Sequence, residues 1–250
     1  MSSGRRREPG RRGVFLARWA VVGLAAVQVG PVVTAAPPVR GRFLPRLSGV
    51  GRPDRVALTF DDGPDPDSTP RFLEVLARHR ARATFFLLGA RVARYPALVG
   101  EIVAEGHEVA VHGWEHRNLL RRGPLATYRD LARARAAITT AAGRPPRFFR
   151  PPYGVLTGPA LLAGVRLGLE PVLWTCWGRD WTARATPESV FRAVTRGLAG
   201  GGTVLLHDSD YAAAPGAWRA GLAALPRVLA ECDGRGWTVG PLGPHLEPAR

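Results

Sequence analysis

Two adjacent carboxylates, Asp61 and Asp62, follow an alternating apolar segment at residues 56–60 and precede Gly63-Pro64. Alternation of this kind is typical of a β-strand, whose successive side chains point to opposite faces, so the two carboxylates cannot do the same job. One of them can hold a metal ion while the other takes a proton during catalysis. The alternative is an ordinary turn, since Asp-Gly and Gly-Pro pairs are turn formers.

Two histidines downstream supply matching metal ligands. His112 directly follows the apolar residues 109–111, and His116 comes four residues later. If this segment coils into a helical turn, both imidazoles lie on one face. Together with one carboxylate they form a two-histidine, one-carboxylate set, which leaves positions open for water and substrate, as a catalytic zinc or iron site requires.

A further histidine, His207, ends the apolar run 203–206. Barrel enzymes carry their catalytic residues at strand ends, and an imidazole pKa is easily placed near neutrality, so we expect His207 to be a catalytic acid. The alternative is a structural histidine bonded to a loop carbonyl. Of the other histidines, we expect a solvated side chain, a structural one and one without a chemical role at positions 79, 107 and 245, respectively.

Two more segments combine charge with aromatic residues. Arg150 follows Phe148-Phe149, and its planar guanidinium could orient a carboxylate through two hydrogen bonds. Asp180 lies next to Trp181, and tryptophan rims suit the C–H faces of sugar rings. For each segment the alternative is aromatic core packing with a surface ion pair.

Five segments, in this order, resemble the NodB-like polysaccharide deacetylases, which are carbohydrate esterase family four. The matching segments are Thr-Phe-Asp-Asp-Gly-Pro at 59–64, His-x3-His at 112–116, Arg-Pro-Pro-Tyr-Gly at 150–154, Arg-Asp-Trp at 179–181 and Leu-Leu-His at 205–207. All five motifs in order make the resemblance specific. There are departures: Gly113 stands where the family usually has Ser or Thr, and Trp177-Gly178 stand where it usually has a further acid. These differences bear on substrate choice more than on reaction type.

The resemblance implies catalytic roles for four residues. Asp61 would be the general base and His207 the general acid of an N-deacetylation. Arg150 and Asp180 would support this pair, one by positioning the base and the other by tuning the acid. The motifs leave open which support contacts which partner.

The resemblance also implies a cofactor and a substrate. A divalent metal, zinc first with cobalt, iron or nickel as alternatives, would be held by Asp62, His112 and His116. The substrate would be an acetylated amino-sugar polymer, either peptidoglycan or chitin-like. Its expected binding residues are Pro151, Tyr153, Trp181 and Leu205, with the backbone N–H of Tyr153 at the oxyanion.

Two other functions stay open: hydrolysis of a C–N bond in a small non-sugar amide, and a non-catalytic cell-wall-binding barrel. The net charge of +15 would attract anionic polymers or lipid surfaces. We expect no nucleic-acid partner, because the sequence has no lysine and its arginines are scattered rather than gathered in one stripe. The sequence does not indicate an oligomeric state.

The chain ends suggest processing. Residues 1–36 combine early arginines with an apolar stretch and an A-x-A-like signal at 33–35, which predicts a secretory signal peptide or a membrane anchor and an extracytoplasmic location. A linker is expected at 37–53, the catalytic domain at 54–240 and a tail at 241–250. We expect membrane contact only through the N-terminal segment. Cys176 and Cys232 could pair outside the cell, but free thiols are favoured.

Strands and helices are predicted to alternate. The predicted strands are 56–60, 84–88, 109–111, 147–149, 170–174, 203–206 and 237–239. The predicted helices are 69–81, 95–105, 125–142, 158–167, 187–197 and 218–232. Such alternation predicts an α/β fold with a parallel sheet. Because the motifs lie at strand ends, we expect a single-domain distorted barrel of seven or eight (β/α) units, with a doubly wound open sheet as the alternative.

Overall fold

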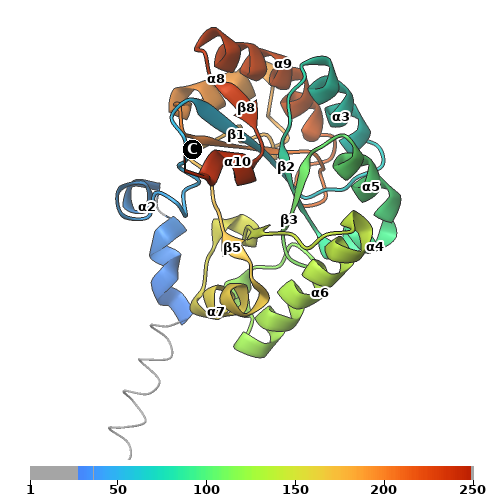
Figure 1. The fold of residues 1–250 in the computed structure, drawn as a ribbon, viewed down its shortest axis with the longest axis vertical. Helices are drawn as coiled ribbons and strands as arrows, with labels where there is room; N and C mark the ends of the chain where they lie inside the picture. Colours follow the sequence, from blue (N-terminus) through green and yellow to red (C-terminus); the bar gives the residue numbers. More distant parts are fainter. Residues whose placement is uncertain (1–27, 36, 249–250) are drawn as a thin grey trace, which may run out of the picture.

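The computed structural model describes residues 28–35 and 37–248 (Figure 1). Most of the predicted signal peptide or anchor, residues 1–27 and 36, lies outside the described residues. Among the residues that are described, no helix is both long enough and apolar enough to cross a bilayer. The N-terminal processing and the extracytoplasmic location therefore stay predictions.

A parallel, curled sheet forms the centre of the molecule. Its strands are β1 (Arg55–Asp61), β2 (Thr84–Leu87), β3 (Glu108–Val111), β4 (Phe148–Phe149), β5 (Glu170–Pro171), β6 (Cys176–Trp177), β7 (Thr203–His207) and β8 (Thr238–Gly240). Their order is β5-β4-β3-β2-β1-β7-β6, and β8 pairs with the first half of β1. This confirms the predicted distorted barrel rather than the doubly wound alternative.

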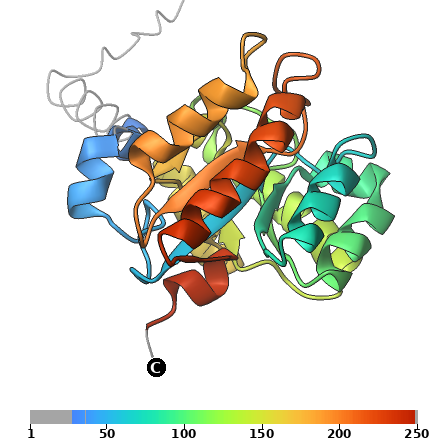
Figure 2. The same cartoon turned by 90° about the horizontal axis from the view of Figure 1, so that it is seen from above.

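Helices surround the outer face of the curled sheet (Figures 1 and 2). They are α3 (Thr69–Arg78), α4 (Gly89–Arg94), α5 (Pro96–Ala104), α6 (Pro124–Ala142), α7 (Gly158–Leu167), α8 (Pro187–Gly197) and α9 (Trp218–Gly234). Alternate residues of β1, such as Leu58 and Phe60, belong to the larger core, which includes buried residues of these helices. The residues between them face the barrel interior, since neighbours on a strand point to opposite faces.

The barrel interior has its own small apolar cluster. It contains residues of four strands, of the loop after β5 and of α10 (Leu242–Leu246), namely Ala57, Phe86, Ala110, Phe148, Val172, Leu242 and Leu246. The backbone N–H of Leu242 donates to Oγ1 of Thr84, the first residue of β2, at 2.9 Å. Helix α10 therefore closes the N-terminal end of the barrel.

The predicted C-terminal tail at 241–250 is wrong for residues 242–246, because they form α10 and its Leu242 and Leu246 are buried in the barrel. His245 is 1% exposed, and its Nε2 lies 3.0 Å from the carbonyl oxygen of Gly49. The predicted linker at 37–53 contains the helix α2 (Pro37–Phe43) and joins the barrel further on. The N–H of Leu173 donates to the carbonyl of Leu47 at 2.7 Å.

Some element boundaries also differ from the prediction. The helix predicted at 95–105 begins at Pro96, and α4 precedes it without having been predicted, because a proline at the first turn starts a new helix. The strand predicted at 170–174 ends at Pro171, and the separate edge strand β6 follows. Three short 3-10 segments complete the fold, namely Gly30–Ala35, Leu119–Arg121 and Pro152–Gly154. Cys176 and Cys232 are buried free thiols, as the sequence favoured.

The closure of the barrel by α10 can be tested with Leu242→Ala. Leu242 is fully buried, so we expect the substitution to lower the free energy of unfolding by about 2–5 kcal/mol, as measured by urea denaturation. The matched control is Leu162→Ala on α7, where the leucine is 49% exposed and a change within about 0.5 kcal/mol is expected. Equal losses in the two variants would contradict a role for α10 in closing the barrel.

Candidate active site

The five motifs meet at the C-terminal end of the barrel. Asp61 is the last residue of β1 and is paired in register with His207, the last residue of β7. His112 follows β3 directly, and Arg150 follows β4. A cavity of about 220 Å³ opens between these strand ends. Its lining contains most of the predicted site residues and, in addition, Gly154, Trp174, Trp177 and Ala212.

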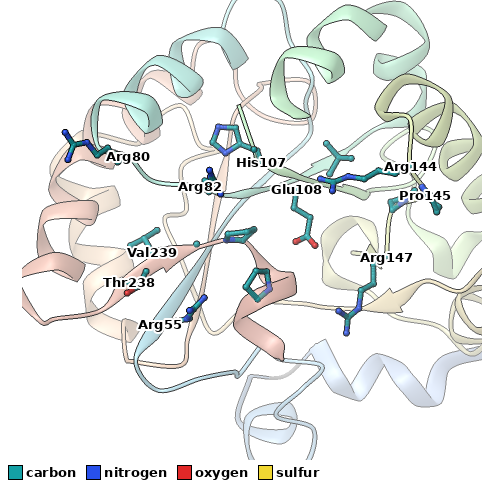
Figure 3. A pocket seen from close by; sticks show the side chains of 16 residues that line it. Arg55, Arg80, Arg82, His107, Glu108, Arg144, Pro145, Arg147, Thr238 and Val239 are labelled. Atoms are coloured by element: carbon teal, nitrogen blue, oxygen red, sulfur yellow. The ribbon is translucent and has the colours of Figure 1, made fainter. Parts of the chain in front are cut away.

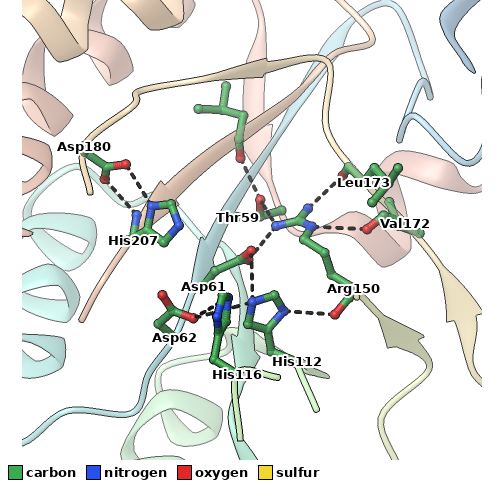
Figure 4. A network of polar contacts seen from close by, with 11 residues as sticks. Thr59, Asp61, Asp62, His112, His116, Arg150, Val172, Leu173, Asp180 and His207 are labelled. Atoms are coloured by element: carbon green, nitrogen blue, oxygen red, sulfur yellow. Dashed lines mark hydrogen bonds and ion pairs between the residues drawn. The ribbon is translucent and has the colours of Figure 1, made fainter. Parts of the chain in front are cut away.

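Asp62, His112 and His116 form the candidate metal site. One ligand atom from each lies within 4.8 Å of the other two. Oδ1 of Asp62 is 3.5 Å from Nε2 of His112 and 3.6 Å from Nε2 of His116 (Figure 4). This oxygen is buried and accepts no hydrogen bond from any described residue, although buried oxygens are normally satisfied. A cation between the three side chains would satisfy it.

The loop that presents the two histidines is a bend rather than the predicted helical turn. Gly113 has a φ of +89°, in the left-handed region that favours glycine. The next backbone N–H, that of Trp114, donates to the buried carboxylate of Asp130 at 2.9 Å. A Cβ at position 113 would lie 3.1 Å from Oδ2 of Asp130. The departure from the family's Ser or Thr is therefore accommodated by a turn that suits glycine.

The protonation states of these side chains also fit metal binding. Nδ1 of His112 lies 2.9 Å from the carbonyl oxygen of Arg150 and must donate to it, which leaves the lone pair of Nε2 directed at Asp62. Burial lowers the pKa of His112 and of His116 to about 3, so both imidazoles are neutral. Burial also raises the pKa of Asp62 to about 7, so this carboxyl is about half protonated at neutral pH and releases the proton when a cation binds. Two neutral imidazoles and one carboxylate suit zinc, and they also suit cobalt, iron or nickel.

Arg150 is the residue that positions the proposed base. The guanidinium is fully buried, and its Nη1 donates to Oδ1 of Asp61 at 2.6 Å and to Oγ1 of Thr59 at 2.9 Å. Its Nε and Nη2 donate to the carbonyls of Val172 and Leu173 at 3.1 and 2.8 Å. The bidentate pairing expected from the sequence is therefore wrong, because only one nitrogen reaches the carboxylate. Oδ2 of Asp61 remains free of Arg150 and lies 3.6 Å from Nε2 of His112.

Asp180 is the residue that holds the proposed acid. Its Oδ1 accepts from Nδ1 of His207 and its Oδ2 from the backbone N–H of His207, each at 2.8 Å (Figure 4). The partner of this imidazole is thus a fully buried carboxylate rather than a loop carbonyl. Burial alone would lower the pKa of His207, but the charge of Asp180 and its hydrogen bond, followed by the charges of Asp62 and Asp61, raise it to about 9. His207 is therefore a cation at neutral pH.

Of the four expected substrate-binding residues, three line the catalytic cavity and one does not. Tyr153 is 60% exposed, and its ring packs edge-on against His116, with ring centroids 4.4 Å apart. Trp181 packs edge-on against His207, with ring centroids 5.6 Å apart. Leu205 lines the cavity, but Pro151 does not, so its predicted contact with substrate is not supported. Trp174 and Trp177 belong to the segment whose tryptophans the sequence suggested as a sugar-binding rim, although only Trp181 was named as a binding residue. Both line the cavity, and their ring centroids are 5.5 Å apart.

One end of this α/β barrel thus combines a positioned carboxylate, a positioned imidazole and a candidate metal site, the groups that hydrolysis of an amide requires. The family model for polysaccharide deacetylase matches residues 48–172. A chitooligosaccharide deacetylase from Sinorhizobium fredii is 38% identical over 204 residues, which are 79% of this chain and 94% of that protein. A peptidoglycan-N-acetylglucosamine deacetylase from Bacillus cereus is 33% identical over 184 residues, covering 73% of this chain and 83% of that protein.

A solved structure gives the same assignment. The family 4 carbohydrate esterase from Streptomyces lividans, in complex with acetate, superposes with a TM-score of 0.67 at 34% identity, covering 75% of this chain and 92% of that one. The chain belongs to the polysaccharide deacetylase family, as the five motifs predicted. By class it is a polysaccharide N-deacetylase.

The role of Asp180 can be tested through the pH dependence of activity. Because its carboxylate raises the pKa of His207, Asp180→Asn should lower that pKa and move the basic limb of the kcat–pH profile to lower pH. In the unsubstituted enzyme His207 keeps its proton until the pH rises through about 9. An NMR titration of the imidazole should show the same shift. Asp233→Asn, an exposed site on α9, is the control; a basic limb unmoved by Asp180→Asn would exclude the tuning role.

Proposed function

We propose that this protein is an extracytoplasmic, metal-dependent enzyme that removes acetyl groups from N-acetylglucosamine residues of a polysaccharide. The observation that supports the proposal is that a carboxylate, Asp61, and an imidazole, His207, line the same cavity, and that each is positioned by a buried residue of opposite charge. Arg150 pairs with Asp61, the proposed proton acceptor, and Asp180 pairs with His207, the proposed proton donor. A proton acceptor and a proton donor beside a candidate metal site are what amide hydrolysis requires.

The residues of this chain divide the reaction between them. A divalent metal held by Asp62, His112 and His116 would supply Lewis acidity toward the acetyl carbonyl. Asp61 takes a proton from the attacking water, whose oxygen bonds to the carbonyl carbon. The family resemblance assigns the backbone N–H of Tyr153 to the developing oxyanion. His207 gives its proton to the nitrogen as the C–N bond breaks, so the products are acetate and a free amino sugar.

The substrate class follows from the rim of the cavity and from the relatives. Three tryptophans border the site, with rings 5.5 Å apart between Trp174 and Trp177 and 4.8 Å apart between Trp177 and Trp181. Such a surface suits sugar rings better than a small non-sugar amide. The names of the two relatives share N-acetylglucosamine chemistry, as a chitooligosaccharide in one case and peptidoglycan in the other. A purely binding role is disfavoured, because a binding protein would need neither the proposed base Asp61 nor the proposed acid His207.

The catalytic assignment predicts the outcome of Asp61→Asn. The amide cannot take the proton, so kcat should fall by about 10²–10⁴-fold while the fold is retained. Acetate release from acetylated chito-oligomers, from peptidoglycan and from acetanilide, measured in parallel, would also identify the preferred substrate class. Asp67→Asn, an exposed position, is the matched control. Near-normal turnover by Asp61→Asn would exclude this residue as the base, and preference for acetanilide would favour the small-amide alternative.

The metal assignment predicts that chelation abolishes acetate release and that added zinc or cobalt restores it. Calorimetric titration of the demetallated protein should show one site, with His112→Ala and His116→Ala each weakening metal binding by more than about tenfold. His79→Ala, an exposed histidine on the outer surface, serves as the control and should leave metal binding unchanged. Full activity of thoroughly demetallated protein would refute the proposal.

A further inference from the structure

A second cavity lies at the N-terminal end of the barrel, opposite to the strand ends that carry the catalytic residues (Figure 3). Its volume is about 580 Å³, and its walls are the segments that lead into β1, β2, β3 and β4, together with β8 and α10. It has no lining residue in common with the catalytic cavity. Its lining includes five arginines from separate parts of the sequence: Arg55, Arg80, Arg82, Arg144 and Arg147.

The protein neutralises this positive charge only in part. Arg55 pairs with Asp54 at 3.9 Å, and Glu108 lies near enough to Arg144 and Arg147 to interact with their charges. Among residues 28–35 and 37–248, no carboxylate lies within ion-pair distance of Arg80, Arg82 or Arg144. Arg147 reaches Glu170 and Glu247 only at 3.6 and 3.9 Å. Guanidinium groups that line one hollow make the electrostatic potential inside it positive, so an anion bound there is favoured.

The one carboxylate in the cavity, Glu108, serves the fold instead. Its Oε2 accepts from Oγ1 of Thr84 at 2.6 Å and from the N–H of Gly243 at 3.2 Å, which fixes α10 against β2 and β3. His107, which also lines the cavity, is neutral, because burial lowers its pKa to about 4. Its Nδ1 accepts a hydrogen bond from the N–H of Ala83. On the other wall, Nε of Arg55 is buried and has no acceptor among the described residues. Its ion partner, Oδ2 of Asp54, lies 3.9 Å away, beyond hydrogen-bond distance, so this N–H can donate to a ligand oxygen.

We propose that this cavity binds phosphate groups of a linear, phosphate-bearing polymer. Phosphate offers several oxygens to neighbouring guanidinium groups and forms short charge-assisted hydrogen bonds with them. A polymer fits better than a bilayer, because none of the large apolar side chains exposed on the described part of the chain lines the cavity. Since the cavity and the catalytic site occupy opposite ends of the barrel, the bound polymer leaves the catalytic end accessible. The enzyme would thereby be retained on a polyanionic matrix while it works on a sugar chain.

The test measures binding of short-chain inorganic polyphosphate to the full-length protein by calorimetry. The unsubstituted protein should bind, with an affinity that falls as salt is added. Arg82→Gln combined with Arg144→Gln should weaken binding roughly tenfold or more. The control, Arg129→Gln combined with Arg166→Gln, removes the same charge from exposed positions on α6 and α7 and should stay within about twofold. Acetate release from a soluble chito-oligomer should be equal in all three proteins.

Four results would overturn the proposal. They are absence of polyphosphate binding at low salt, equal weakening in the two double variants, tighter binding of poly-glutamate than of polyphosphate, and binding of phosphatidylglycerol vesicles without polyphosphate binding. If Arg82→Gln with Arg144→Gln lowers the melting temperature, Arg80→Gln with Arg147→Gln provides the same comparison from other walls of the cavity. The outcome is independent of the proposed deacetylation, because polyphosphate binding requires neither metal nor sugar.

Discussion

The buried guanidinium of Arg150 is the interaction on which the catalytic end of this barrel depends. Removing a charge from water is costly, and here the cost is offset by four acceptors and by the face of Phe86, whose ring lies 3.9 Å from Cζ. Two of the acceptors are carbonyls in the segment between β5 and β6, the two edge strands of the sheet. One side chain therefore ties the open side of the barrel to β1 and fixes the carboxylate of Asp61.

The same principle operates on the other side of the site with the charges reversed. Asp180 is a buried anion whose two oxygens bind the backbone and the imidazole of His207. The buried cation fixes the position of the nearby carboxylate, and the buried carboxylate raises the pKa of the nearby imidazole. The register that pairs Asp61 with His207 on adjacent strands brings these two arrangements to one cavity.

Much of this was readable from the sequence, because motif residues at strand ends converge in a parallel barrel. The fold class came from the alternation of strands and helices, and the residues gathered in the cavity came from the motifs together with the family resemblance. The partners of Arg150 did not, since Val172 and Leu173 offer backbone carbonyls, which carry no sequence signature. Likewise the residues 242–246 contain proline and glycine and read as a tail; only the unfilled interior of the barrel explains why Leu242 and Leu246 are buried.

Strand β1 has a consequence for how the chain reaches this state. It pairs with β2 from the next segment of the sequence, but also with β7 and β8, which are synthesised well over a hundred residues later. Contacts so distant along the chain form slowly, because a long loop must be closed first. The earliest strand of the domain thus pairs fully only after the last strands are made, and until then a nascent chain exposes unpaired backbone N–H and C=O groups along one edge of β1.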